Sequence, residues 1–445
     1  MKYQAYEEYK GSGVEWLGSI PVSWHALSIK RISEIFNGAT PKSGEKAYWD
    51  GDVSWVTPAD LGKTTSPFIS SGARSITIEG FDSCGTSLVP VGTILLSSRA
   101  PIGTLGIAAN DLCTNQGCKS LVVDKMFYSK YLYYVLLSST KQLNLLGRGT
   151  TFLELSSDEL GGYKIGFPPK GEQQKITNFL DHETAKIDTL IEKQQQLIKL
   201  LKEKRQAVIS HAVTKGLNPN APMRDSGVEW LGEVPEHWKV VPIKRVCEVK
   251  DGTHDTPQYV DKSEHSYPLI TSKDFEGNAV SFDNAKYISQ DDHLEVIKRS
   301  NTEIGDVLMS MIGGNIGKAL IVRDTAEFSI KNVALFKTVD CESLAQYILF
   351  YLQSGLLDVQ ISLLSRGGAQ GFLSLGDLRN LVFFKLPENE LKAIVVELRK
   401  RAIKFDNLIV KAELAIKIIQ ERRTALISAA VTGKIDVRNW QALHA

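Results

Sequence analysis

Apolar residues recur at alternating spacings of four and three in two long stretches of the chain. The first stretch runs from Gly171 to Val213, and the second covers the last part of the sequence. A repeat sustained over more than three heptads predicts a coiled-coil seam. Each helix would be about 60 Å long at ~1.5 Å per residue. Two such helices in one chain most simply pair with each other, antiparallel. The seam positions are Ile187, Ile191, Gln194, Ile198, Leu201, Arg205, Val208 and Ala212, then Phe405, Ile409, Ala412, Ile416, Ile419, Arg423, Leu426 and Ala430.

Further apolar residues lie beside this seam and widen the stripe. A stripe wider than one seam indicates a bundle completed by helices from outside. We therefore expect partner proteins to bind this row of residues: Leu190, Leu197, Leu200, Leu408 and Ile418.

Arg205 and Arg423 interrupt the seam at equivalent positions. Each is expected to be an ion-paired arginine that sets the helix register, with Glu203 and Glu421 nearby. A direct contact with DNA or a partner is the alternative.

Short β-rich runs separated by turn residues precede each long helix. Val53–Thr57 and Thr93–Ser97 are predicted strands, and 129–146 is a predicted helix. The expected fold class is α+β, with two similar mixed α/β domains joined by two long antiparallel coiled-coil helices.

The two halves repeat one another. Ser12–Gly18 returns unchanged as Ser226–Gly232, and Tyr131–Leu136 resembles Tyr347–Leu352. The period is half the chain, so each copy must be a complete folding unit, and the whole is expected to have an internal pseudo-two-fold axis. The predicted segments are a first domain at 1–166, a central helix at 167–218, a second domain at 219–384 and a C-terminal helix at 385–445.

The loops of the two copies diverge. Residues 37–48 share little with 251–259, and 66–84 has no obvious counterpart. Such a pattern is expected of two recognition modules with different specificity, although drift of surface loops after duplication would produce it too.

The composition of the chain limits which partners and which cellular compartment can be expected. Its 445 residues are 43% hydrophobic with a net charge of +1, so a DNA-binding surface would require positive charge that is clustered rather than abundant. Five cysteines without a CxxC pair predict a reducing cytoplasm. No apolar run approaches the ~18 residues of a membrane span, so no membrane association is expected.

Motifs for catalysis are missing. Gly313–Lys318 looks like a phosphate-binding loop, but the required first glycine falls on Ile312, and Ala319 replaces the Ser or Thr after the lysine. The chain contains no Pro-Asp dipeptide of the kind found in nucleases. We expect that the chain is not an enzyme by itself.

Together these features resemble the specificity subunit of Type I restriction–modification systems. The repeated Ser-Gly-Val-Glu-Trp-Leu-Gly motif is followed by Pro21 and Trp24, or by Pro235 and Trp238. Asp251–Pro257 resembles that family's loop in the second domain, and 37–41 is similar to the corresponding loop of the first. Both long helices end near Ala-Val-Thr. The resemblance covers essentially the entire chain.

That resemblance implies two target recognition domains, each reading one half of a bipartite site in double-stranded DNA. It also implies recruitment of two modification (methyltransferase) subunits, which transfer a methyl group from S-adenosylmethionine to adenine. Restriction/translocase subunits, which use ATP and Mg, add cleavage. No cofactor is expected in this chain.

Polar residues in the loops are the candidates for DNA contact. Arg148 matches Arg366 between the copies, so a phosphate contact is expected for that pair, whereas unshared residues suit bases. For each candidate, an ordinary solvated loop is the alternative. The candidates are Thr40, Lys42, Ser43, Ser98, Arg99, Arg148 and Thr150 in the first domain, and Thr253, His254, Thr256, Ser272, Lys273, Asn315 and Arg366 in the second.

Two other functions remain open at this stage. A duplicated coiled-coil scaffold could join two protein partners without reading DNA, which the near-zero charge favours. A single-chain nuclease is disfavoured by the missing motifs. Trp16 and Trp230, identical in both copies, are expected to be packing anchors.

Overall fold

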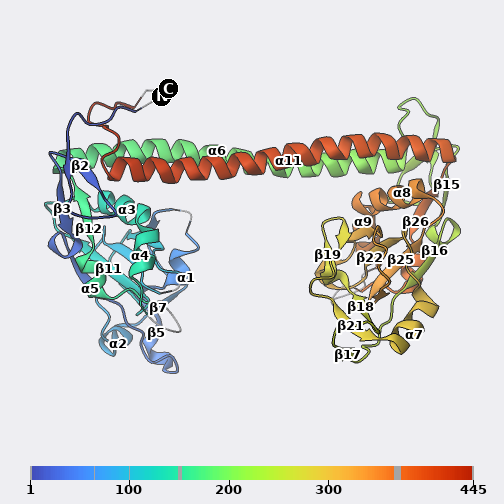
Figure 1. Ribbon diagram of the computed structural model, residues 1–445, viewed down its shortest axis with the longest axis horizontal. Helices are drawn as coiled ribbons and strands as arrows, with labels where there is room; N and C mark the ends of the chain where they lie inside the picture. The colour runs from blue at the N-terminus through green and yellow to red at the C-terminus, as the bar shows by residue number, and fades with distance from the viewer. Residues whose placement is uncertain (1–2, 65, 100, 149–152, 365–371, 443–445) are drawn as a thin grey trace. The chain divides into compact units, whose positions relative to one another are not determined.

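The computed structural model describes residues 3–64, 66–99, 101–148, 153–364 and 372–442, without the side chain of Asn315. The chain forms two compact units (Figure 1). The first unit comprises Met1–Gln194 and Leu414–Ala445, and the second comprises Gln195–Glu413. Each unit contains one mixed α/β domain and a stretch of both long helices.

The first domain is built on a five-stranded sheet in the order β4-β11-β8-β9-β6. A second sheet, β10-β5-β7, and two strand pairs, β1-β2 and β3-β12, complete its strands. The strand bounds are β1 Tyr9–Gly11, β2 Ser19–Pro21, β3 His25–Ser28, β4 Ser33–Asn37, β5 Trp49–Val56, β6 Phe68–Ile69, β7 Arg74–Ile76, β8 Ile94–Ser97, β9 Leu105–Ala108, β10 Cys113–Thr114, β11 Cys118–Val123 and β12 Lys164–Phe167. The strands predicted at 53–57 and 93–97 are confirmed as β5 and β8.

Short α-helices accompany these strands in the described part of the domain: α1 Pro58–Leu61, α2 Ile78–Asp82, α3 Ser129–Ser138, α4 Thr140–Leu146 and α5 Ser157–Gly162. The helix predicted at 129–146 is therefore two helices. The break falls at Ser139, where the hydroxyls of Ser138 and Ser139 both donate to the carbonyl of Val135, at 2.8 Å each. Side chains that bond the preceding turn in this way compete with continuation of the helix.

The second domain has a sheet in the order β16-β25-β22-β23 and another in the order β17-β21-β18-β24. Its remaining strand pairs are β13-β14, β15-β26 and β19-β20. The strand bounds are β13 Met223–Asp225, β14 Glu233–Pro235, β15 Lys239–Pro242, β16 Glu248–Asp251, β17 Tyr259–Val260, β18 Ser266–Ile270, β19 Phe275–Glu276, β20 Ala279–Val280, β21 Lys286–Ser289, β22 Val307–Ser310, β23 Ala319–Ile321, β24 Ser329–Ile330, β25 Val333–Lys337 and β26 Val382–Lys385. Its helices are α7 Gln290–Ser300, α8 Glu342–Gln353, α9 Leu356–Leu364 and α10 Leu375–Arg379.

The two domains share one sheet framework. Strands β4, β11, β8 and β9 pair in the same order and sense as β16, β25, β22 and β23. The register matches as well, because the pairs Lys119–Asn37 and Lys119–Leu96 correspond to Ala334–Asp251 and Ala334–Met309. The repeat seen in the motifs thus extends through the core strands.

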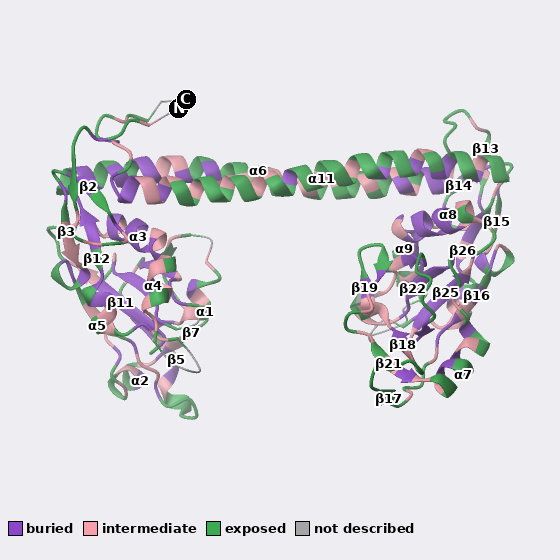
Figure 2. Ribbon diagram, viewed as in Figure 1, coloured by how far each residue is buried: buried purple, intermediate pink, exposed green. Residues whose placement is uncertain are grey.

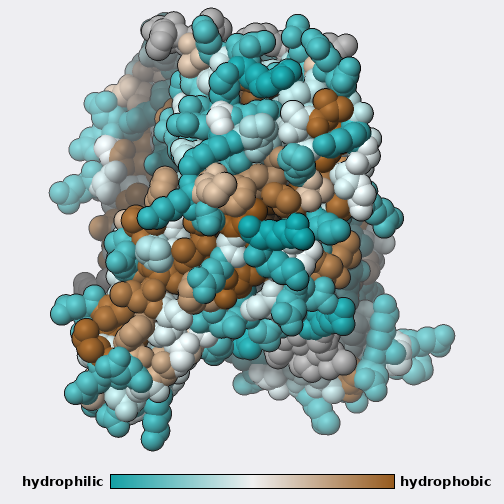
Figure 3. All heavy atoms as spheres, turned by 90° about the vertical axis from the view of Figure 1, so that its left-hand side faces the viewer, coloured by the Kyte–Doolittle hydropathy of each residue, from teal (hydrophilic) through white to brown (hydrophobic). Residues whose placement is uncertain are grey.

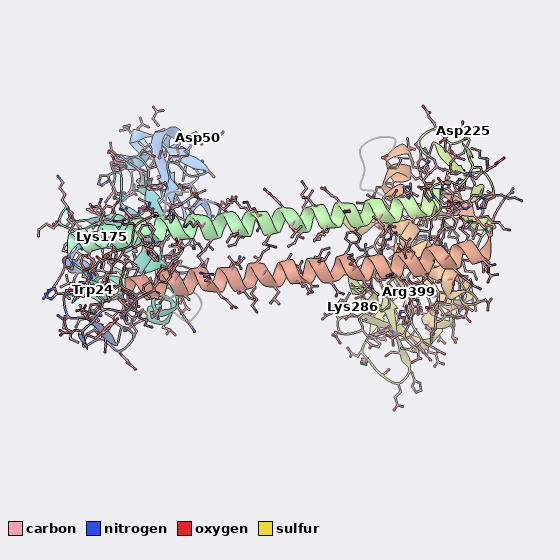
Figure 4. The ribbon with its side chains drawn as sticks, turned by 90° about the horizontal axis from the view of Figure 1, so that it is seen from above. Trp24, Asp50, Lys175, Asp225, Lys286 and Arg399 are labelled. Carbon is pink, nitrogen blue, oxygen red and sulfur yellow. The ribbon has the colours of Figure 1, made fainter. Side chains whose placement is uncertain are left out.

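The long helices are α6, Lys170–Lys215, and α11, Glu388–Val431. Within each unit the two helical stretches lie side by side and run in opposite directions (Figures 1 and 4). The predicted seam positions are all buried or half-buried, whereas most residues between them are exposed (Figure 2). The coiled-coil prediction is confirmed.

The two seam arginines form ion pairs, as the register interpretation requires. In the first unit, Arg423 Nε lies 2.8 Å from Asp188 Oδ1. In the second, Arg205 Nε lies 3.1 Å from Asp406 Oδ1, while its Nη2 donates to the side-chain oxygen of Gln353 at 3.3 Å. The partners are thus aspartates of the facing helix. Glu203 and Glu421, the acidic residues expected near these arginines, are not their ion-pair partners. Each lies at an exposed position on the same helix as its arginine.

A buried tryptophan attaches each domain to the first turn of a long helix. Trp24 donates through Nε1 to Glu172 Oε1 at 2.7 Å, and Trp238 donates to Glu390 Oε2 at 3.0 Å. Both tryptophans are completely buried. Figure 4 shows Trp24 near the beginning of α6, the helix that carries Lys175. An acidic side chain near a helix N-terminus is also favoured by the helix dipole.

The tryptophans of the repeated motif pack as anchors beside this junction. Trp16 stacks on Tyr163 with ring centroids 5.2 Å apart, and its Nε1 donates to the carbonyl of Lys164 at 3.1 Å. Trp230 packs against the core of the second unit.

Among the described residues, no single helix is long and apolar enough to span a membrane. The pair α8 and α9, bent by 61°, passes that test together by length and composition. Most residues of α8 are buried in the core of the second unit.

Candidate nucleic-acid interface

Two of the candidate arginines in the first domain lie on either side of Glu154. The backbones of Arg99 and Arg148 each form an isolated β-bridge with Glu154. Arg99 Nη2 lies 3.1 Å from Glu154 Oε2, and Arg148 Nη2 lies 2.5 Å from Glu159 Oε1. The Arg148 side chain is 84% exposed, so its ion pair can exchange for a phosphate contact with little desolvation.

Lys119, which was not predicted from the sequence, lies in the same region. Lys119 Nζ donates to Asn37 Oδ1 at 2.7 Å, and the Ser157 hydroxyl donates to the same oxygen at 2.9 Å. Burial lowers the pKa of the Lys119 ammonium, and the nearby Glu154 carboxylate opposes that effect. The sequence signal was a lysine inside the largely apolar run of β11.

The predicted loop at 40–43 begins with a side-chain contact to the turn before β11. The Thr40 hydroxyl donates to the Gln116 side-chain oxygen. Lys42 and Ser43 are exposed, as a DNA contact would require. Ser98 is completely buried and its hydroxyl donates to the Gly117 carbonyl at 3.1 Å, so we assign this residue to the framework.

The second domain has a cavity of about 630 Å³ whose lining includes Lys273, Lys286 and Lys331. Ser272, Asn284 and Asn332 also line it, together with the Tyr259 side chain. Lys286, marked in Figure 4, is exposed. Three lysines and one aspartate, Asp274, line this cavity, so its charged side chains carry a net positive charge of the clustered kind that the neutral composition made necessary. Of these residues, Ser272 and Lys273 were predicted from the sequence.

The predicted loop of the second domain is fixed by hydrogen bonds. His254 Nε2 lies 2.9 Å from Asp251 Oδ2, and its Nδ1 lies 3.0 Å from Asn332 Oδ1. Asp251 is almost completely buried and also accepts from Arg299 Nε at 3.0 Å. The Thr256 hydroxyl is bonded by Lys331 Nζ. Thr253 is half-buried and donates its backbone N–H to Ile330.

Three predicted contacts cannot be placed. Thr150 and Arg366 lie outside the described residues, as does the side chain of Asn315.

The predicted partner-binding row is exposed in both units. In the first unit, Leu190 is 50% exposed and Ile418 is 55% exposed. In the second, the exposed fractions are 43% for Leu197, 61% for Leu200 and 40% for Leu408. Figure 3, which looks onto the first unit, shows further apolar side chains in a band across an otherwise largely hydrophilic face. Exposed apolar rows on a helix pair are typical of surfaces that other proteins cover.

Comparisons with known proteins agree with this architecture. Residues 21–200 match the family model described as Type I restriction modification DNA specificity domain. The Type I restriction enzyme MjaIX specificity subunit of Methanocaldococcus jannaschii is 27% identical over 98% of this chain and 98% of its own length. The EcoBI specificity subunit of Escherichia coli is 23% identical, over 96% of this chain and 90% of its own.

Solved structures show the same fold. A chain from a structure on complex assembly and conformational transition of the type I R-M system gives a TM-score of 0.65 at 15% identity. It covers 94% of this chain and 99% of that one. The HsdS subunit of Thermoanaerobacter tengcongensis gives 0.52 at 15% identity, covering 94% and 98%. By its repeated motifs, its two framework-sharing domains and these relatives, the chain is similar to the specificity subunits of Type I restriction–modification systems.

Proposed function

We propose that each domain of this chain reads one half of a bipartite site in double-stranded DNA, and that the two halves differ in sequence. The observation that carries the proposal is a shared framework with different side chains at its ends. At one equivalent position the first domain pairs Arg99 with Glu154, whereas the second pairs Ile312 with Phe372. A retained scaffold with exchanged surface chemistry fits two readers better than one duplicated binding face.

The basic side chains supply the contacts that do not depend on sequence. Arg148 and Lys42 in the first domain, and Lys273 and Lys286 in the second, are exposed and suited to phosphates. Their number is small, which matches the net charge of +1. We expect weak binding by the chain alone and tighter binding in the complex with its partner subunits.

The exposed row on α6 and α11 is the proposed docking surface for two modification subunits, one on each unit. These subunits would supply the transfer of a methyl group from S-adenosylmethionine, and restriction/translocase subunits would supply ATP-driven cleavage. In this arrangement the chain itself recognises the DNA sequence and serves as the scaffold for the other subunits. Replacement of Leu197 by Asp should weaken recovery of the modification subunit, with exposed Glu203→Gln as the control on the same helix.

Selection from a pool of randomised duplexes tests the DNA-reading proposal. The complex of this chain with its modification subunits should retain duplexes with two short conserved blocks separated by an unconserved gap. Its binding should weaken steeply with salt. A duplicated scaffold that reads no DNA would retain no sequence and would show no salt-dependent complex with DNA.

We also propose that the helices set the gap between the two blocks. Seven residues inserted in each helix, within 192–204 and within 410–422, keep the heptad phase and add about 10 Å. At ~3.4 Å per base pair, the gap should lengthen by about three base pairs. A gap of unchanged length would refute this role of the helices.

A further inference from the structure

The loop after β4 and the loop after β16 are held by equivalent backbone hydrogen bonds. Ala39 donates its N–H to the Thr114 carbonyl, and Thr253 donates to that of Ile330, at 3.0 Å in each case. The residues that follow those carbonyls also match, because Asn115 N–H donates to Val56 and Lys331 N–H donates to Ile270. These bonds align the two domains residue by residue at one end of the shared sheet.

Glycine makes this close approach possible. A Cβ atom on Gly38 would lie 2.0 Å from the Asn115 carbonyl oxygen, and one on Gly252 would lie 2.2 Å from that of Ile330. Either distance is far inside van der Waals contact, so a larger residue would push the loop away from the turn. Both domains therefore keep a glycine where the loop meets the turn.

Beyond these glycines, each domain pairs one loop side chain with one side-chain amide of the turn. In the first domain the Thr40 hydroxyl donates to the side-chain oxygen of Gln116. In the second, His254 Nδ1 lies 3.0 Å from the side-chain oxygen of Asn332. The two pairs occupy the same place in the framework but differ in both residues.

The turn is one residue shorter in the second domain, yet the amide is kept. Gly117 accepts the N–H of Ser98 at 2.8 Å, and Asn332 accepts that of Met311 at 3.5 Å. Asn332 thus combines the backbone role of Gly117 with the side-chain role of Gln116. It does so with a left-handed φ of +54°, which asparagine tolerates better than most residues.

Within each pair, the amide keeps free hydrogen-bonding groups. Both ring nitrogens of His254 are engaged, one by Asn332 and one by the buried Asp251 carboxylate. In the described part of the chain, neither amide nitrogen, of Gln116 or of Asn332, donates a hydrogen bond. Each amide oxygen also keeps a second lone pair.

We propose that Gln116 and Asn332 are the base-reading residues at this position of the two domains, and that each recognises adenine. An amide can accept from adenine N6 and donate to N7 in the major groove, and no other base offers that pattern. Thr40 and His254 are positioning residues that hold the amide oxygens in place. This assignment rests on the proposed DNA-reading function and names residues that carry it.

The test uses the complete complex with its modification subunits, the duplex pool described above and two matched variants. Gln116→Ala should reduce discrimination at one base pair of one block by about ten- to hundredfold and leave the other block unchanged. Asn332→Gly, which keeps the left-handed backbone without strain, should do the same in the opposite block only. Each variant is therefore the control for the other.

Two further substitutions separate base reading from a structural role. Gln116→Glu and Asn332→Asp keep the side-chain shape but remove the donor, so the preferred base should change from adenine towards cytosine, whose N4 donates. Thr40→Val should relax the same base pair as Gln116→Ala, whereas Thr40→Ser should retain wild-type discrimination.

The possible outcomes separate failure of the base-reading assignment from failure of the proposed DNA-reading function. If the wild-type complex selects no bipartite sequence, the proposed function fails. If it does select one, and the Gln116 and Asn332 variants assemble and select the same sequence with equal discrimination, the base-reading assignment is overturned. Uniform weakening on all sequences would instead make the two amides phosphate contacts and would also overturn it.

Discussion

Two positions of the internal repeat behave in opposite ways. At the junction with the long helices, Trp24 with Glu172 and Trp238 with Glu390 form the same hydrogen bond from indole to carboxylate in both units. At the end of the central sheet, Arg99 with Glu154 gives way to Ile312 with Phe372. What is kept after duplication holds each domain to its helix, and what has changed lies on the candidate DNA surface. Structural contacts that are retained between the copies therefore belong to the scaffold, whereas base recognition is expected where the copies differ.

Removing the retained tryptophans should have the largest effect. Trp24→Ala or Trp238→Ala should lower the free energy of unfolding of its unit by about 3–5 kcal/mol, because each leaves a large cavity and removes one hydrogen bond to a carboxylate. Denaturant unfolding of the complete chain measures this. Exposed Val22→Ala is the control, with a change of less than about 0.5 kcal/mol expected. If all three variants lost the same small free energy of unfolding, the two tryptophans would not be structural anchors.

Exchanging the diverged pair should change specificity and spare stability. The double variant Arg99→Ile with Glu154→Phe gives the first domain the second domain's residues. Loss of the arginine should change base preference in one half-site by about 1–3 kcal/mol. Duplex selection measures both halves, and a change in both, or in neither, would contradict the assignment of this position to one reader.

The arginine shared between the copies should act equally in both. Arg148→Ala and Arg366→Ala should each weaken binding to all sequences and reduce the salt slope by about one unit. Titrations at several salt concentrations provide the slope. If either variant relaxed a single base pair at constant slope, the shared arginine would be a base reader.

The interhelical ion pairs should have the smallest effect. Asp188→Asn and Asp406→Asn should each cost less than about 1 kcal/mol, since both aspartates are about half exposed and water screens the pairs. Both variants are measured by thermal unfolding. A large loss in only one unit would show that the pairs are not equivalent.

Much of the fold could be predicted because it depends on periodicity. The seam positions from Ile187 to Ala212 follow from heptad spacing alone, and the strands β5 and β8 follow from short β-rich runs. The ion-pair partners could not be predicted, because Asp188 and Asp406 meet the arginines across two helices and sequence neighbours do not reveal that geometry. The break at Ser139 depends on hydroxyls bonding the backbone, which apolar spacing does not record.

The candidate site was predicted less completely for a related reason. Loop residues such as Lys42, Lys273 and His254 could be selected from the motifs. Gln116 and Asn332 were missed, since each becomes a candidate only when a distant loop is bonded to its turn. Ser98 shows the converse, because a polar residue beside an arginine proved to be buried.

Sequencing of methylated bases in DNA from cells that contain the complete complex shows directly whether the two domains read different half-sites. Two unlike domains on a shared framework predict one modified site made of two different short blocks separated by an unspecified gap. A single uninterrupted palindrome would contradict recognition by two unlike domains, as would two identical halves.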